Sequence, residues 1–299
     1  MNYDYSINKI LFLTYLTNYN IDQIYLGLKS DDFSLFIEMI IISKNTIKNS
    51  FSDSDVYKAE SVAITRHDEM IYNKIILLSC LDPKYPEGFK QINQPPPIIF
   101  IKGMLGNTKN CAVVGSRKIS HHAFETVNNV VSTFVNENFG IISGNALGID
   151  SIVHSKAIHA KGYTIAVMGT SLESVYPKEN LNLANSIIES GGALISELAF
   201  GIRKGKMGFI ARNRLQSAMS DFIIPIEMNV NSGTLHTVNF CKQQNKYLVI
   251  IAPNAEKQIL PEYKGINYLM KTNYKNKLIV QEGFGFDDIT EGIKKLLKS

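Results

Sequence analysis

From Asn110 onward, six short apolar runs alternate with segments of helical length. The runs are CAVVG (111–115), GIISG (140–144), TIAVMG (164–169), ALISEL (193–198), FIIPIE (222–227) and YLVIIAP (247–253). Because their apolar residues are continuous rather than alternating, the runs are typical of strands buried on both faces of a parallel sheet. Strand and helix repeated in this way predict an α/β fold, a Rossmann-like doubly wound and mostly parallel sheet.

The remaining parts of the chain predict smaller units around this sheet. Residues 1–70 mix polar and apolar residues with helical character, which predicts a small helical N-terminal domain. A proline-rich stretch then leads into the sheet, and Pro95, Pro96 and Pro97 within it form a stiff extended connector. We expect the Rossmann-like core to cover 71–285 and one C-terminal helix to cover 286–299, with no winged-helix domain after it.

Composition and motifs exclude several classes of protein. A chain of 299 residues with 45% hydrophobic and 19% charged residues is ordinary for a soluble protein. The sequence shows no apolar run long enough for a membrane span and no signal peptide, and its three cysteines lack metal-ligand spacing, so we expect a cytoplasmic protein. The motifs for nucleotide hydrolysis, dinucleotide binding and zinc are missing. We therefore expect no cofactor, no metal and no catalytic residue.

Glycine and hydroxyl residues follow several of the apolar runs. In a doubly wound sheet, ligands bind beyond the carboxyl ends of the strands, where backbone N–H groups and helix N-termini attract anions. The candidate residues in these loops are Gly115, Ser116, Ser143, Gly144, Gly148, Ser232, Gly233 and Thr234. Tight turns need such glycines without any ligand, so only their gathering on one edge favours a binding site.

Basic residues accompany these loops. The segment between Gly201 and Arg214 holds five basic residues and no acidic one, although a net charge of +4 does not by itself demand an anionic partner. Arg117, Arg212 and Arg214 can each donate charge-assisted hydrogen bonds worth about 1.5–3 kcal/mol. The alternative is a solvated cationic loop. Together with the glycine loops, the arginines favour a phosphate site for a nucleic acid strand.

Other polar residues near the strand ends have structural interpretations. We expect Ser120 and Asp150 to cap the helices that follow them, and His154 to be packed rather than reactive. Glu197 and Glu227 are placed like general bases, but a cap or an arginine-orienting role fits both equally well. Tyr176 and Lys178 follow the third run and are expected near the same edge of the sheet.

Six ordered motifs resemble those of the DprA/Smf family of DNA-processing proteins. They are VGSRKIS, IISGNALGIDSIVHSKAI, TIAVMGTSLESVYPKEN, GGALISEL, FIARNRLQSAMSDFIIPIE and NSGTLHTVNFCKQQNKYLVIIAP. The resemblance covers roughly residues 77–270. It implies a Rossmann-like core that binds single-stranded DNA without strong sequence preference, loads the RecA recombinase during natural transformation or recombination, and forms a homodimer. It implies no enzymatic activity and no membrane association.

The resemblance also implies roles for particular residues. Arg117 would contact a phosphate, and Lys178 would lie on the same basic rim. Lys206 would hold the DNA backbone and Phe209 would stack on a base, ahead of the basic motif formed by Arg212, Asn213 and Arg214. Base stacking of about 1–3 kcal/mol per base together with phosphate neutralisation is how strand binders without sequence preference work.

Two other functions remain open at this point. One is an enzyme resembling the phosphoribohydrolases of the related nucleotide-binding group, which carry a glutamate two or three residues after a Gly-Gly-x-Gly-Thr loop. The corresponding stretch here, residues 233–237 (GTLHT), contains no acidic residue, which argues against hydrolysis. The other is a sensor that binds a small nucleotide in the same pocket, and the sequence does not exclude it.

Overall fold

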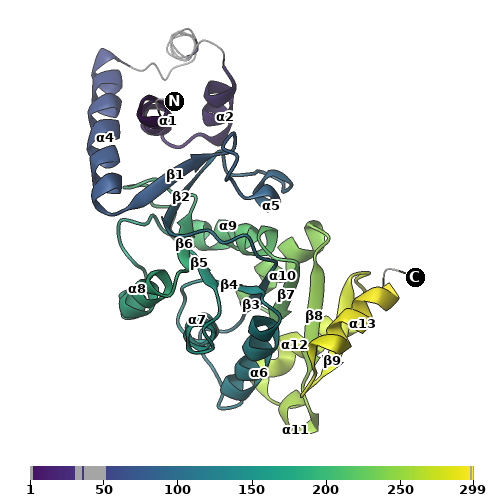
Figure 1. Ribbon diagram of the computed structural model, residues 1–299. Coiled ribbons are helices and arrows are strands. Elements are labelled where there is room, and N and C mark those ends of the chain that lie inside the picture. The colour runs from purple at the N-terminus through teal and green to yellow at the C-terminus, as the bar shows by residue number, and fades with distance from the viewer. Residues whose placement is uncertain (1–2, 31–35, 37–51, 297, 299) are drawn as a thin grey trace.

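The computed structural model describes residues 3–30, 36, 52–296 and 298, and within them one nine-stranded sheet forms the centre of the molecule (Figure 1). The strand order is β1-β2-β6-β5-β4-β3-β7-β8-β9. The strands are β1 (Ile75–Ser79), β2 (Ile98–Gly103), β3 (Asn110–Val114), β4 (Gly140–Ser143), β5 (Thr164–Val167), β6 (Ala193–Ser196), β7 (Phe222–Pro225), β8 (Tyr247–Ala252) and β9 (Lys277–Gln281).

The strands from β3 to β9 are parallel to one another, and β1 and β2 join the β6 edge in antiparallel pairing. Every residue of β4, β5, β6 and β7 is buried, as continuous apolar runs require. The predicted α/β class is confirmed, and each of the six apolar runs contains one strand.

Helices cover both faces of the sheet. Alternate residues of β3 point to opposite faces: Ala112 packs in one apolar cluster with α9 and α10, and Val113 packs in another with α6 and α7. The helices of the first face are α5 (Glu87–Lys90), α9 (Gly205–Ala218), α10 (Thr234–Gln243) and α12 (Lys264–Lys271). Those of the second face are α6 (Ala123–Asn136), α7 (Ile149–His159), α8 (Leu181–Glu189) and α13 (Phe286–Leu296). The short helices η1 (Lys178–Asn180), α11 (Ala255–Gln258) and η2 (Pro261–Tyr263) lie in connections.

The sheet has one point at which the strand order reverses. From β3 the chain builds β4, β5 and β6 outward in one direction, and then returns to place β7, β8 and β9 on the other side of β3. A crevice opens at such a point because the connections after β3 and β7 leave toward opposite faces. The loops after β3 and β7 are therefore where this fold offers a binding site.

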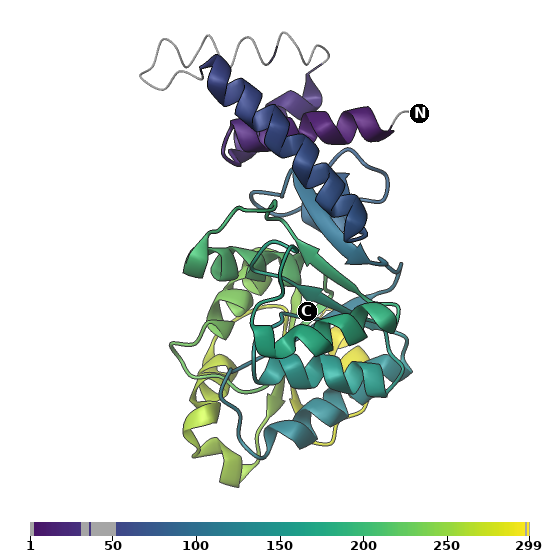
Figure 2. The ribbon, with the colours of Figure 1, turned by 90° about the vertical axis from the view of Figure 1, so that its left-hand side faces the viewer.

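The N-terminal part of the chain packs at the β1–β2 end of the sheet (Figures 1 and 2). Its helices are α1 (Tyr3–Leu16), α2 (Ile21–Lys29) and α4 (Asp53–Tyr72). Leu13 and Met70 belong to one apolar cluster with Phe100 of β2 and Phe200. The predicted helical character is found in these three helices, whereas residues 31–35 and 37–51 lie outside the described residues. A domain boundary near residue 70 stays a prediction.

None of the helices in the described residues has the length and apolar composition needed to cross a membrane. Within the same residues, no group of three His, Cys, Asp or Glu side chains is arranged to hold a metal ion.

Candidate functional site

An open cleft of about 550 Å³ lies at the carboxyl ends of β3 and β7, where the strand order reverses. Its walls come from the loop after β3, the loop after β4 with the start of α7, the loop after β5, one side of α9 and the loop before α10. The polar and aromatic residues that line it are Ser116, Arg117, Asp150, Tyr176, Lys206, Phe209, Arg212, Asn213, Gln216, Asn231, Ser232, Thr234, His236 and Thr237. Five segments of the sequence thus meet at one edge of the sheet.

Arg117 is the exposed cation at the mouth of this cleft. Its guanidinium lies 5.9 Å from the centre of the Phe209 ring, and it forms no ion pair with any described carboxylate. The Phe209 ring packs against Tyr176 with 5.5 Å between ring centres. A cation without an acidic partner beside two aromatic rings is suited to a phosphate and its attached base.

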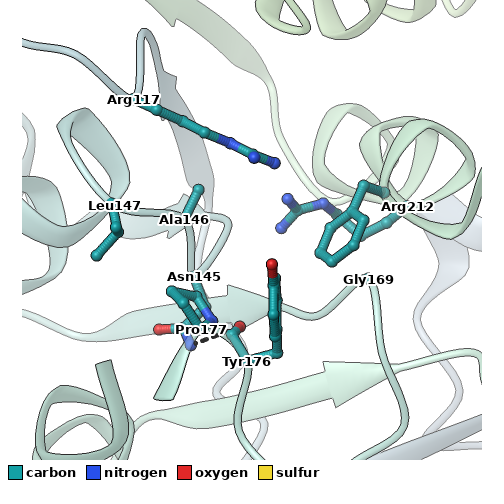
Figure 3. Close-up of a pocket in the computed structure, with 9 residues that line it drawn as sticks. Arg117, Asn145, Ala146, Leu147, Gly169, Tyr176, Pro177 and Arg212 are labelled. Carbon is teal, nitrogen blue, oxygen red and sulfur yellow. Dashed lines mark hydrogen bonds between the residues drawn. The ribbon is translucent and has the colours of Figure 1, made fainter. Parts of the chain in front are cut away.

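A smaller cavity of about 80 Å³ adjoins the cleft, and two arginines share it (Figure 3). The guanidinium groups of Arg117 and Arg212 point toward each other across this cavity, with the Tyr176 hydroxyl below the gap (Figure 3). Asn145 lines the same cavity; its amide nitrogen donates to the Tyr176 carbonyl, and its side-chain oxygen is buried without a partner. Two like charges facing one gap repel each other, so an anion held between them would be stabilised.

Arg212 is buried at the floor of the cleft, with 6% of its surface exposed. It donates a hydrogen bond to the Val167 carbonyl at the end of β5, while its Nε has no partner among the described residues. Burial lowers the pKa of the guanidinium, and the nearby Asp150 carboxylate opposes that shift. Burial likewise raises the pKa of Asp150, which Arg212 opposes. The two charges offset each other in part, and Arg117 adds an uncompensated one.

The N-terminus of α10 lines the same cleft. The backbone N–H groups of Gly233 and Thr234 make no hydrogen bond within the described chain, and Ser232 Oγ is buried without a partner. The ten-residue helix α10 directs the positive end of its dipole at the same place. The α10 N-terminus therefore offers hydrogen-bond donors to an anion in the cleft that Arg117 and Arg212 also line.

Most of the residues that the sequence predicts for the site are brought together here. The predicted residues that line the cleft are Gly115, Ser116, Arg117, Lys206, Phe209, Arg212, Asn213, Ser232, Gly233 and Thr234. Two further glycines shape it from behind: Gly144 lies directly against Arg212 and Asp150, and Gly148 lies directly under the carbonyl groups of Ser116 and Arg117. The structure places these residues but does not test what they bind.

Three predicted residues lie outside the two cavities. Ser143 is fully buried and its hydroxyl donates to the Val113 carbonyl, so it supports the sheet. Lys178 is exposed in η1 and lines neither cavity. Arg214 is buried in an ion pair with Glu197, at 2.6 Å between Nη2 and Oε2, and also donates to the Gln94 carbonyl. Its charge is therefore satisfied within the protein.

Arg212 and Arg214 both lie on helix α9 and not in a cationic loop, the alternative that the sequence left open. Residues two apart on an α-helix point about 200° apart around its axis. Arg212 consequently faces the cleft, whereas Arg214 faces the buried Glu197 on the other side of the helix.

The capping predictions also need correction. Helix α6 starts at Ala123 after His122, and Ser120 instead donates its hydroxyl to the buried carboxylate of Glu227. Asp150 lies within the first turn of α7 and accepts a hydrogen bond from the Ala146 N–H. Glu227 and Glu197 both serve to hold other side chains, which is the structural interpretation that the sequence left open.

Sequence reasoning missed several residues that line the cavities. Tyr176 was placed near this edge but not within the site, and Asn145, Gln216 and His236 were not considered. Asn145 and His236 lie beside the predicted glycine loops, and this proximity could have identified them as site residues. Gln216 lies one helical turn after Arg212, so only knowledge of the helix could have found it.

His154 is buried beneath the cleft and is predicted to make stability depend on pH. Its Nε2 lies 2.6 Å from the Gly144 carbonyl oxygen, and burial lowers its pKa from 6.5 to about 4. Since the unfolded chain binds a proton more readily, stability is full above about pH 6.5 and is lost as the pH falls toward 4. We expect a loss of about 2 kcal/mol between pH 7 and pH 5, measured by urea unfolding.

A His154→Gln variant is the control for this pH dependence. It should be less stable than the parent at pH 7, but its stability should fall less between pH 7 and pH 5. Asp150, whose pKa is raised, acts in the opposite direction in both proteins and cancels from the comparison. An equal fall in the two proteins would contradict the assignment to His154.

Comparisons with known proteins agree with this geometry. The model of the family described as DNA recombination-mediator protein A matches residues 76–284, more than half of the chain. DNA processing protein DprA of Streptococcus pneumoniae is 35% identical over 177 residues, which are 58% of this chain and 62% of that protein. Protein Smf of Borreliella burgdorferi is 36% identical over 155 residues, 51% of this chain and 49% of that protein. The match spans about half the length of such relatives.

Solved structures share the fold. The X-ray structure of DprA from Streptococcus pneumoniae superposes with a TM-score of 0.68 and 25% identity over 97% of both chains. A structure of DprA from Helicobacter pylori, which concerns its single-stranded DNA binding mode, superposes with a TM-score of 0.62 and 24% identity over 75% of this chain and 96% of that one. With the family model matched across the sheet and the cleft, the chain belongs to the DprA/Smf family of DNA recombination-mediator proteins.

Proposed function

We propose that the chain binds single-stranded DNA in the cleft between β3 and β7, without strong sequence preference. The observation that carries the proposal is that Arg117, Arg212 and the α10 N-terminus all line one cleft, together with the Phe209 ring. The cationic groups would hold phosphates and the aromatic rings would stack bases. Lys206, exposed at the start of α9, would extend the cationic path along the strand.

The two aromatic rings of the cleft favour a single strand over a duplex. Phe209 and Tyr176 can stack only on bases that are not already stacked in a double helix. Both rings lie beside the phosphate-binding donors rather than apart from them, so one nucleotide can use both kinds of contact. Stacking also tolerates any base, which accounts for the absence of sequence preference.

The carboxylates of the site favour binding rather than hydrolysis. Glu197 is paired with Arg214, and Glu227 accepts hydrogen bonds from the backbone and hydroxyl of Ser120. Asp150 is the one carboxylate among the described residues that line the cleft, and it is occupied by the Ala146 N–H and lies against Arg212. Among the described residues, no carboxylate without a partner therefore lines the cleft.

Beyond DNA binding, we propose that the protein hands the strand to RecA during natural transformation or recombination, in the cytoplasm and as a homodimer. Membership of a recombination-mediator family supports the handover. Its measurement is the rate at which RecA forms filaments on oligonucleotides already covered by a single-strand-binding protein, with and without this protein.

Arg117→Ala is expected to weaken the binding of fluorescent oligothymidylate by about 10- to 100-fold, because one charge-assisted contact is lost. Fluorescence anisotropy across a series of salt concentrations measures both affinity and its salt dependence. The slope of log K against log salt should become shallower by about 0.7, the value for one phosphate of a single strand. The side chain is exposed, so the thermal midpoint should stay unchanged.

Lys118→Ala is the matched control, because Lys118 is an exposed cation one residue further on that does not line the cleft. It should reduce affinity much less than Arg117→Ala does. A sensor for a single nucleotide would instead show a shallow slope in the parent protein and a preference for mononucleotides over oligothymidylate. Equal affinities of the parent and Arg117→Ala would refute the assignment of Arg117.

A further inference from the structure

The segment that leads from β6 into α9 is held by the N-terminal helices. The Tyr15 hydroxyl donates to the Phe200 carbonyl at 3.0 Å, and the Tyr19 hydroxyl donates to the Glu197 carbonyl. Lys204, the residue before α9, lies with its Nζ 4.7 Å from the centre of the Tyr19 ring. The connection of residues 197–204 is therefore fixed by contacts from α1 and the turn that follows it.

A second loop beside the cleft is attached to the same place. Glu173 lies three residues before Tyr176 and accepts a hydrogen bond from the Gly201 N–H at 3.0 Å. Its carboxylate is also 4.0 Å from the guanidinium of Arg66 on α4. The loop that carries Tyr176 and the connection into α9 are thus joined to each other and to an N-terminal helix.

The start of α9 has few other contacts to fix it. Gly205, Lys206 and Met207 are exposed, and the first close packing of the helix is Gly208 against the Gly169 carbonyl. The later turns of α9, from Arg212 to Ala218, are buried, so the anchors before the helix act mainly on its exposed first turns. Those turns carry Lys206 and Phe209 into the cleft.

We propose that Tyr15, Tyr19 and Glu173 are positioning residues for DNA binding, through which the N-terminal helices hold α9 and the Tyr176 loop in the geometry that accepts a strand. The inference rests on the proposed function for its effect on affinity. It goes beyond that function because none of the three residues lines the cleft. The N-terminal helices become part of the binding apparatus rather than a separate attachment.

The test uses the full chain with the double substitution Tyr15→Phe/Tyr19→Phe, which removes two hydroxyl groups and keeps both rings in the core. We expect the affinity for oligothymidylate to fall about three- to tenfold, with unchanged thermal midpoint within a few degrees. Amide hydrogen exchange of residues 198–210 should become faster, because the connection and the first turns of α9 lose their anchors. Tyr57→Phe on α4, whose side chain is 75% exposed, is the control and should change neither quantity.

Glu173→Ala is an independent test, because the positioning role and simple charge removal predict opposite changes in DNA affinity. Removing a carboxylate near a polyanion site would by itself strengthen DNA binding, whereas the loss of the Gly201 anchor would weaken it. We expect weaker binding and faster exchange near Gly201. Tighter binding, or unchanged exchange in both variants, would overturn the positioning role.

The exchange measurement also separates this inference from the proposed function. If the parent protein bound no oligothymidylate, the proposed function would fail, but faster exchange of residues 198–210 in the variants would still support the anchoring. Normal DNA binding by the parent with slow exchange in the variants would overturn the anchoring alone.

Discussion

Arg214→Met is expected to lower the free energy of unfolding by about 3–5 kcal/mol, the usual cost of removing one partner from a buried ion pair. The Arg214 and Glu197 side chains are 8% and 6% exposed, and their charged groups are 2.6 Å apart. Without the guanidinium, the Glu197 carboxylate is left buried and unpaired. Urea unfolding followed by circular dichroism measures the loss.

The double variant Arg214→Met/Glu197→Leu tests the cause of that loss. Removing both charges eliminates the unpaired carboxylate, so the double variant should be more stable than Arg214→Met alone. The Gln94 carbonyl, which accepts two hydrogen bonds from Arg214, loses its partner in both variants and contributes equally to each. If the double variant is no more stable than the single one, the ion pair is not the source of the effect.

The buried pair also shows that Arg212 and Arg214 have different surroundings. Arg214 fastens α9 to Glu197 at the end of β6 and to Gln94 in the proline-rich lead-in, while Arg212 faces the cleft. The helix therefore directs one arginine into the cleft and is held in place by the other. DNA binding by an Arg214 variant would fall through displacement of α9, with no change in the number of phosphates contacted.

The sheet could be predicted from the sequence because its signal is local. A strand buried on both faces must be apolar throughout, so each parallel strand can be recognised from four to six consecutive apolar residues. The loops after β3 and β7 could be predicted for a related reason, since the topology fixes which strand ends face the ligand. Gly115, Arg117 and Gly233 were found in this way.

The direction of side chains on α9 could not be predicted, because it depends on where the helix begins. The basic residues suggested a loop, and the glycines at 201, 205 and 208 gave no helical signal. Packing of Leu215 and Ala218 against the sheet sets the orientation of the helix and so separates Arg212 from Arg214. Tyr15 and Tyr19 contact residues that lie 185 and 178 positions further along the chain. No local sequence pattern predicts contacts over such separations.

Gly148→Ala is expected to lower both stability and strand binding, because Gly148 adopts a backbone conformation with φ of 85° that other residues rarely adopt. The strained backbone costs about 1–3 kcal/mol. In addition, a Cβ at this position would overlap the Ser116 carbonyl oxygen and lie 2.5 Å from that of Arg117. The loop that carries Arg117 must therefore move, which should cost about 1–3 kcal/mol more. Urea unfolding and oligothymidylate anisotropy measure the two effects.

Gly191→Ala isolates the contribution of the overlap. Gly191 has nearly the same φ, 87°, but nothing lies within 4 Å of an added Cβ, and it is in the loop before β6, away from the cleft. This variant should show the cost of backbone strain alone and bind oligothymidylate as tightly as the parent does. Gly148→Ala should be less stable than Gly191→Ala and should bind at least as weakly as Arg117→Ala, since displacing the loop removes the Arg117 contact and disturbs its neighbours. Strand affinity that is unchanged in Gly148→Ala would mean that the loop after β3 does not hold the DNA.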